Sequence, residues 1–116
     1  MIMKIAIIGS RSFKDYSKLE KSILTHIAVS EIDLIVSGGA VGADSLAESF
    51  ADKYKIPVKL FLPDWELYGR SAGVVRNKYI IKESDVVIAF WDGISKGTKH
   101  SIDLANKQNK KVIIIS

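Results

Sequence analysis

The chain has 116 residues, of which 47% are hydrophobic and 26% are charged, so its length and composition suit one compact globular core. It contains no cysteine, which excludes a disulfide framework, a thiolate metal site and a cysteine nucleophile. No apolar run reaches the roughly 18 residues that a membrane helix needs, and the apolar N-terminal stretch has no signal-peptide cleavage site. We therefore expect one domain over residues 1–116, located in the cytoplasm and not in a membrane.

The formal net charge of +4 would suit an anionic partner. The lysines are scattered along the chain and do not form one basic block, so most of them are explained by solubility.

Five apolar runs rich in β-branched residues predict strands. They occupy residues 3–9, 33–38, 57–62, 85–91 and 111–116. Runs this continuous are typical of strands that are buried on both faces of a parallel sheet.

Segments with apolar residues at three- and four-residue intervals alternate with these runs and predict helices. They extend from Tyr16 to Ile27, from Ala43 to Tyr54, and over about 71–83 and 97–108. The alternation predicts an α/β fold with about five mainly parallel strands between two layers of helices. Residues 63–73 are less regular and are the predicted functional excursion.

Ligands of open α/β sheets lie beyond the carboxyl ends of the strands. Two loops there, 37–44 and 92–98, are glycine-rich and precede helices, so they offer free N–H groups and a positive dipole end to a phosphate. Neither loop matches the P-loop or the dinucleotide fingerprint. One such loop alone is equally explained by a tight turn, but two together favour binding.

Arg11 and Arg76 are the expected phosphate ligands, because a guanidinium binds phosphate with two donors. Alternatively, either arginine pairs with a carboxylate such as Asp44 or Asp92. Asp44 complements a helix dipole, or accepts hydrogen bonds from sugar hydroxyls or from its own loop, and Ser45 with Glu48 has the spacing of a capping box.

Trp65 and Trp91 follow strands, and packing is expected ahead of base stacking for each. His26 is expected outside the site. His100 is the only histidine expected near it, so the sequence predicts no metal site.

With these loops laid out, the chain resembles the small YspA-like members of the SLOG superfamily, which includes the DNA-processing protein DprA and the LOG phosphoribohydrolases. Residues 9–11, 37–51, 64–77 and 89–98 carry the resemblance in the same order. It implies a Rossmann-like three-layer α/β/α fold and a pocket for a nucleotide or nucleotide-derived ligand, in a sensor or regulatory role without a cofactor. It leaves self-association open.

Two alternative functions follow from this resemblance, one as an enzyme and one as a nucleic-acid-binding protein. The LOG motif GGxGTxxE ends in a catalytic glutamate, but Ser101 stands at that position here, so the acid/base group is missing unless Asp44 or Asp103 replaces it. The DprA pattern has a histidine and a basic residue where Glu48 and Val41 stand, which makes single-stranded nucleic-acid binding the lesser alternative.

The loops and the resemblance together give one set of candidate ligand-binding residues, with no catalytic residue assigned. They are Gly9, Ser10, Arg11, Ser37, Gly38, Gly39, Gly42, Asp44, Trp65, Arg76, Asn77, Asp92, Gly93, Ser95, Gly97 and Thr98.

Overall fold

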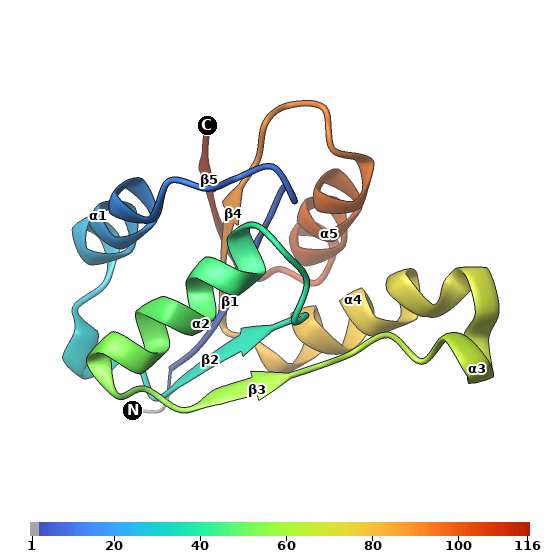
Figure 1. The fold of residues 1–116 in the computed structure, drawn as a ribbon, viewed down its shortest axis with the longest axis horizontal. Helices are drawn as coiled ribbons and strands as arrows, with labels where there is room; N and C mark the ends of the chain where they lie inside the picture. The colour runs from blue at the N-terminus through green and yellow to red at the C-terminus, as the bar shows by residue number, and fades with distance from the viewer. Residues whose placement is uncertain (1–2) are drawn as a thin grey trace.

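Five parallel strands form one sheet in the order β3-β2-β1-β4-β5 in a computed structural model that describes residues 3–116 (Figure 1). Residues 1–2 of the predicted domain lie outside this range. The strands are β1 (Lys4–Gly9), β2 (Leu34–Ser37), β3 (Val58–Leu60), β4 (Val86–Phe90) and β5 (Lys111–Ile115). The predicted Rossmann-like α/β fold is confirmed, and every strand pair in the sheet is parallel.

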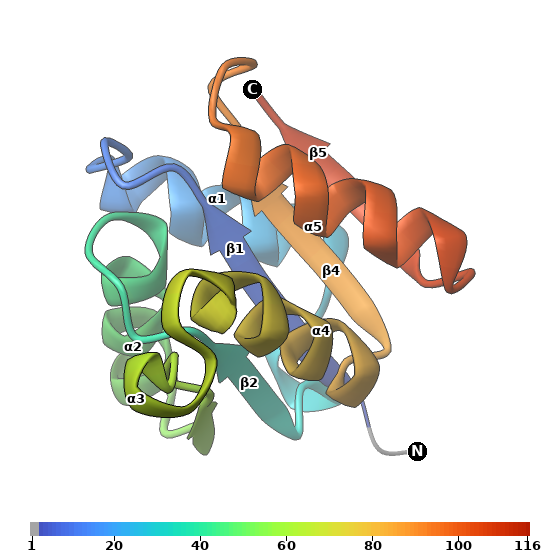
Figure 2. The ribbon, with the colours of Figure 1, turned by 90° about the vertical axis from the view of Figure 1, so that its right-hand side faces the viewer.

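Helices cover both faces of the sheet (Figure 2). They are α1 (Tyr16–His26), α2 (Ala43–Tyr54), α3 (Trp65–Tyr68), α4 (Ala72–Glu83) and α5 (Lys96–Lys107), with 3₁₀ turns at Val29–Glu31 and Gly69–Ser71. The predicted excursion 63–73 thus holds α3 and a 3₁₀ turn. None of the helices in residues 3–116 is both long and apolar enough to cross a lipid bilayer.

The core consists of two apolar layers, one on each side of the sheet. Side chains of β1 alternate between them, with Ile5 and Ile7 against α1 and α2, and Ala6 and Ile8 against α4 and α5. This double burial explains why β1 reads as an unbroken apolar run.

The expectation of burial on both faces is wrong for residues 57–62 and 111–116, because they form the two edge strands of the sheet and no residue of β3 or β5 is fully buried. β3 is the edge strand next to β2, and Val58 and Leu60 keep 36% and 43% of their surfaces exposed. A β-branched run therefore predicts a strand here without predicting its place in the sheet.

The strand order reverses between β1 and β4, which are hydrogen-bonded neighbours although β2 and β3 lie between them in sequence. The loops after β1, β2 and β4 meet beyond the carboxyl ends of their strands. This is where a ligand of an open α/β sheet binds.

Candidate functional site

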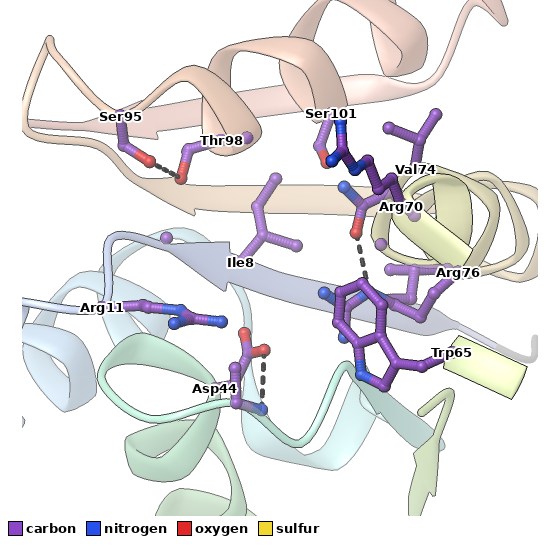
Figure 3. Close-up of a pocket in the computed structure, with 16 residues that line it drawn as sticks. Ile8, Arg11, Asp44, Trp65, Arg70, Val74, Arg76, Ser95, Thr98 and Ser101 are labelled. Atoms are coloured by element: carbon purple, nitrogen blue, oxygen red, sulfur yellow. Dashed lines mark hydrogen bonds between the residues drawn. The ribbon is translucent and has the colours of Figure 1, made fainter. Parts of the chain in front are cut away.

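A cavity of about 380 Å³ lies at this edge, between the loops after β1 and β2 and the first turns of α4 and α5 (Figure 3). Nine of the sequence-predicted residues line it: Gly9, Arg11, Asp44, Trp65, Arg76, Asn77, Ser95, Gly97 and Thr98. The other seven, which do not line it, are Ser10, Ser37, Gly38, Gly39, Gly42, Asp92 and Gly93. Seven positions outside the predicted set complete the lining: Ile8, Ala40, Arg70, Gly73, Val74, Ile80, and Ser101, which the sequence analysis named only for the missing glutamate.

All three arginines of the chain, Arg11, Arg70 and Arg76, line this cavity, whereas none of its 14 lysines does. Arg11 and Arg70 are exposed, and Arg76 is half-buried. Within residues 3–116 none of the three forms an ion pair with a carboxylate, so the alternative pairing with Asp44 or Asp92 is not made. The cavity therefore concentrates guanidinium groups whose positive charge is available to a guest.

Arg76 is held in place by two hydrogen bonds. Its Nε donates to Oδ1 of Asn77 at 2.8 Å, and its Nη1 donates to the carbonyl oxygen of Gly38 at 2.8 Å. Burial lowers the pKa of Arg76 from its ordinary value, although the nearby Asp44 carboxylate opposes this shift. These bonds fix the guanidinium at the cavity before a ligand arrives.

Asp44 is a buried carboxyl group in the first turn of α2, with 8% of its surface exposed. Its Oδ2 accepts a hydrogen bond from the backbone N–H of Ala40 at 3.2 Å, which is the loop contact expected for it. Burial raises the pKa of Asp44 to about 6, and the Ala40 bond and the Arg76 charge only partly offset this rise. The site thus holds a carboxyl group that titrates close to neutral pH.

The proposed capping box of Ser45 and Glu48 is wrong. Gly42 is the N-cap of α2, no side chain caps this end, and Ser45 lies inside the first turn. A capping box needs its serine at the N-cap, which is position 42 here, three residues before Ser45.

The glycines divide into two kinds. A Cβ on Gly42, whose φ is +81°, would lie 2.5 Å from the carbonyl oxygens of Ser10 and Arg11, and one on Gly9 would lie 2.6 Å from the carbonyl oxygen of Phe90. These two glycines let the loops pack on one another. A Cβ on Gly97 would meet no atom within 4 Å, because Gly97 faces the open cavity.

The loop before α5 is shaped by Asp92. Its Oδ1 accepts hydrogen bonds from the N–H groups of Ile94 and Ser95, at 2.8 and 2.7 Å, and these bonds hold the pKa of Asp92 below its usual value. Ser95 Oγ contacts Thr98 Oγ1 at 3.2 Å and does not cap the helix backbone. The first turn of α5 therefore presents uncapped N–H groups on the side where Gly97 and Thr98 line the cavity.

Residues 3–68 match the model of a family described as YspA, cpYpsA-related SLOG family. The chain is also 34% identical over 117 residues to the Gene 61 protein of Mycobacterium phage D29, an alignment that covers 95% of this chain and 94% of that protein. The chain belongs to the YspA, cpYpsA-related SLOG family. The resemblance inferred from the loop motifs is thereby confirmed.

Solved structures similar to this SLOG protein include two DNA processing proteins A. The Helicobacter pylori protein is 24% identical with a TM-score of 0.75, over 98% of this chain and 65% of that chain. The Streptococcus pneumoniae protein, DprA, is 19% identical with a TM-score of 0.82, over 99% of this chain and 50% of that chain. This SLOG chain spans only half to two thirds of these relatives, and at these identities the likeness shows the fold.

In this SLOG protein, Ser101, which the motif resemblance aligns with the LOG glutamate, is buried and lines the cavity. Asp103 is exposed and its Oδ2 accepts a hydrogen bond from Lys99 Nζ at 2.9 Å, away from the lining residues. Of the two carboxylates considered as replacements, Asp44 alone lines the cavity.

The two tryptophans of the SLOG chain differ. Trp91 Nε1 donates to the carbonyl oxygen of Ser95 at 3.0 Å, which is the packing role expected for it. Trp65 keeps 59% of its surface exposed and lines the cavity from α3, so packing does not explain it. His26 and His100 are exposed and do not line the cavity.

Most of the seven predicted residues outside the lining make contacts that hold the loops together. Ser10 Oγ accepts from Asp92 N–H at 3.4 Å, and Ser37 Oγ accepts from Gly39 N–H at 3.4 Å.

Among the missed residues, Gly73 and Ile80 lie on the same face of α4 as Arg76 and Asn77, so helical spacing offered a signal for them. For Arg70, the only sequence signals were its residue type and its position within residues 63–73.

Proposed function

We propose that this SLOG protein binds a nucleotide or a nucleotide-derived ligand in the cavity and acts as a cytoplasmic sensor or regulatory module. The observation that carries the proposal is the convergence of all three arginines of the chain on one cavity without a lysine. A guanidinium binds phosphate with paired donors that a lysine lacks. A cavity lined by arginines and no lysine therefore favours recognition of a phosphate group over nonspecific attraction of anions.

The remaining lining residues suit the rest of a nucleotide. The uncapped first turn of α5 adds N–H donors for a phosphate. Asn77 and Asp44 offer polar atoms to a sugar, and the exposed indole of Trp65 offers an aromatic face to a base. A volume of about 380 Å³ falls within the range of small-molecule sites.

Isothermal titration calorimetry against a panel of nucleoside mono-, di- and triphosphates tests the proposal. Arg70→Ala removes an exposed cavity arginine, and Lys107→Ala removes an exposed positive charge from the far end of α5 as a matched control. Loss of a charge-assisted phosphate contact weakens binding by about tenfold to a hundredfold for Arg70→Ala and leaves Lys107→Ala near wild type. Absence of binding across the panel, or an equal loss in both variants, would refute the proposal.

A hydrolase acting on the N-glycosidic bond of a nucleotide is the second candidate, and Asp44 favours it. Its carboxyl group lines the cavity, and burial raises its pKa to about 6, a value suited to proton transfer near neutral pH. Release of free base from nucleoside monophosphates by the wild type, lost in Asp44→Asn, supports this candidate. No release from any purine or pyrimidine nucleotide rules it out.

Single-stranded nucleic-acid binding is the lesser alternative. The Helicobacter pylori DNA processing protein A is described as having a single-stranded DNA binding mode, and its fold matches this chain. Binding of this kind predicts an affinity for single strands that falls steeply with salt. Absent or salt-insensitive binding rejects it.

A further inference from the structure

The three arginines of the cavity do not form one cluster (Figure 3). Arg11 belongs to the loop after β1, and its guanidinium group points toward Asp44. Arg70 belongs to the 3₁₀ turn before α4, and its guanidinium group lies on the side of the cavity that α5 forms. In the view of Figure 3, Ile8 lies between these two arginines. The cavity thus carries positive charge at two separate places.

Arg76 shares one of these places with Arg11. Burial is the main reason why the pKa of Arg76 lies below its ordinary value, and the positive charge of Arg11 lowers it further, against the opposing effect of Asp44. The charge of Arg70 makes no such contribution. Because charges interact more strongly at shorter distance, Arg11 and Arg76 form one positive subsite and Arg70 forms a second.

Asp44 adjoins the subsite of Arg11 and Arg76 without neutralising it. A Cβ on Gly38 would meet Nη1 of Arg76 and lie 2.9 Å from Oδ2 of Asp44, so both side chains end at the same place. They form no ion pair within residues 3–116, and Asp44 Oδ2 accepts the N–H of Ala40. Two guanidinium groups beside one carboxylate leave an excess positive charge for an anionic group of a ligand.

The size of the cavity limits what can connect the two subsites. Its volume of about 380 Å³ lies near the lower end of the range of roughly 300–1,000 Å³ for small-molecule sites. One nucleoside with its phosphate groups suits such a volume, whereas two linked nucleosides would extend beyond it. The two positive subsites therefore call for two anionic groups on one small molecule.

We propose that the ligand is a nucleoside with phosphate groups at two different positions of its sugar, one bound by Arg70 and the other by Arg11 together with Arg76. This inference rests on the proposed function, because it specifies the ligand of the same cavity. A chain of phosphates at one position places its added charge beside the first phosphate, at one subsite. Phosphates at two positions reach both subsites, and the second binds from a molecule that the first already holds.

Isothermal titration calorimetry compares derivatives of the nucleoside that binds best in the panel above: the 5′-monophosphate, the 5′-diphosphate, and the 3′,5′- and 2′,5′-bisphosphates. We expect one bisphosphate to bind about tenfold or more tightly than the diphosphate, which has the same number of phosphate groups. If neither bisphosphate binds more tightly than the diphosphate, this inference is overturned and the proposed function stands. Absence of binding by every derivative overturns both.

Arg11→Ala locates the second phosphate group. Arg11 is exposed and forms no ion pair within residues 3–116, so this variant is expected to keep the fold. It should weaken binding of the bisphosphate about tenfold more than binding of the monophosphate. Lys14→Ala is the matched control, because Lys14 is an exposed cation of the same loop that does not line the cavity. Equal losses for both ligands in Arg11→Ala, or the same preferential loss in Lys14→Ala, would contradict the assignment.

Asp44→Asn tests the same subsite in the opposite direction. Removing the carboxylate leaves Arg11 and Arg76 without an opposing charge, so the phosphate beside them should be held more strongly. At about pH 8, where Asp44 is ionised in the wild type, we expect the ratio of bisphosphate to monophosphate affinity to rise about threefold or more. A ratio that is unchanged or lower would place the second phosphate away from Arg11 and Arg76 and refute the assignment.

Discussion

Arg76 and Gly38 are joined by a hydrogen bond of 2.8 Å from Nη1 of the arginine to the glycine carbonyl oxygen, which ties α4 to the loop after β2. A Cβ on Gly38 would clash with that same Nη1 and lie 2.9 Å from Oδ2 of Asp44. Arg76 and Asp44, two of the charged side chains of the cavity, therefore converge on a space that a glycine leaves open. This relationship gives Gly38 a structural role although it does not line the cavity.

Replacing Gly38 by alanine is expected to destabilise the protein. The added methyl group displaces the ends of the Arg76 and Asp44 side chains and breaks the bond from Arg76 to the Gly38 carbonyl, which costs about 1 kcal/mol. Gly97→Ala is the matched control, because its Cβ meets no atom within 4 Å and alanine favours a helix. Urea denaturation should show a lower free energy of unfolding for Gly38→Ala alone. Equal values for the two variants would contradict this role.

The layout of strands and helices could be predicted because each buried element repeats one physical pattern. Helix α2 was expected over the residues that the structure gives, Ala43 to Tyr54, since its apolar positions recur with the period of a helix. β4, and β1 after its first residue Lys4, are apolar because both of their faces are buried. β3 differs from them, because Lys59 is its middle residue and Pro57 precedes it, and a charged residue and a proline are local signs of an edge strand that the apolar-run reading passed over.

The place of the candidate site could also be expected from topology, because parallel strands end at one edge of a sheet. The role of each individual side chain at the site could not be predicted in this way. Gly42 and Gly97 look alike in sequence, yet Gly42 packs against the loop after β1 and Gly97 faces the cavity. Arg70 reaches the cavity only through the path of the arm between β3 and α4, which depends on tertiary packing.

Asp44 should make stability depend on pH between about 4 and 6. Burial raises its pKa from the ordinary 3.8 to about 6, so the folded state keeps its proton over a range where the unfolded chain has lost it. The contribution of Asp44 to the free energy of unfolding therefore falls as pH rises through this window and then levels off. Asp44→Asn removes this fall and should exceed the wild type at pH 7 by up to about 3 kcal/mol.

Urea denaturation from pH 4 to pH 7 measures this difference. Asp52→Asn is the control, because Asp52 is an exposed carboxylate on the same helix. Its stability should follow the wild-type pH dependence. If the difference between Asp44→Asn and the wild type stays constant with pH, the buried carboxyl group does not titrate as expected.

Asp92 should control the order of the loop before α5. Its Oδ1 accepts from the N–H groups of Ile94 and Ser95, and both bonds are lost in Asp92→Ala. Hydrogen exchange of these two amides should become faster, while amides in the buried β4 keep their protection. Because these bonds lower the pKa of Asp92, their contribution is present above the pKa of the unfolded chain and is lost as pH falls through the folded value. Unchanged exchange of Ile94 and Ser95 would show that the backbone alone holds the loop.

Trp65 and Trp91 give a fluorescence test of base stacking in the proposed site. Trp65 is exposed at the cavity, so a base stacked on its indole should quench its emission, whereas Trp91 is fixed by its bond to Ser95. Trp91→Phe should retain the quenching by a bound nucleotide but lose about 1 kcal/mol of stability with that hydrogen bond. Trp65→Ala should lose the quenching and bind about tenfold or more weakly, as expected for a lost stacking contact, with stability changed by less than about 0.5 kcal/mol. Quenching that persists in Trp65→Ala and disappears in Trp91→Phe would place the base near the loop before α5 and away from α3.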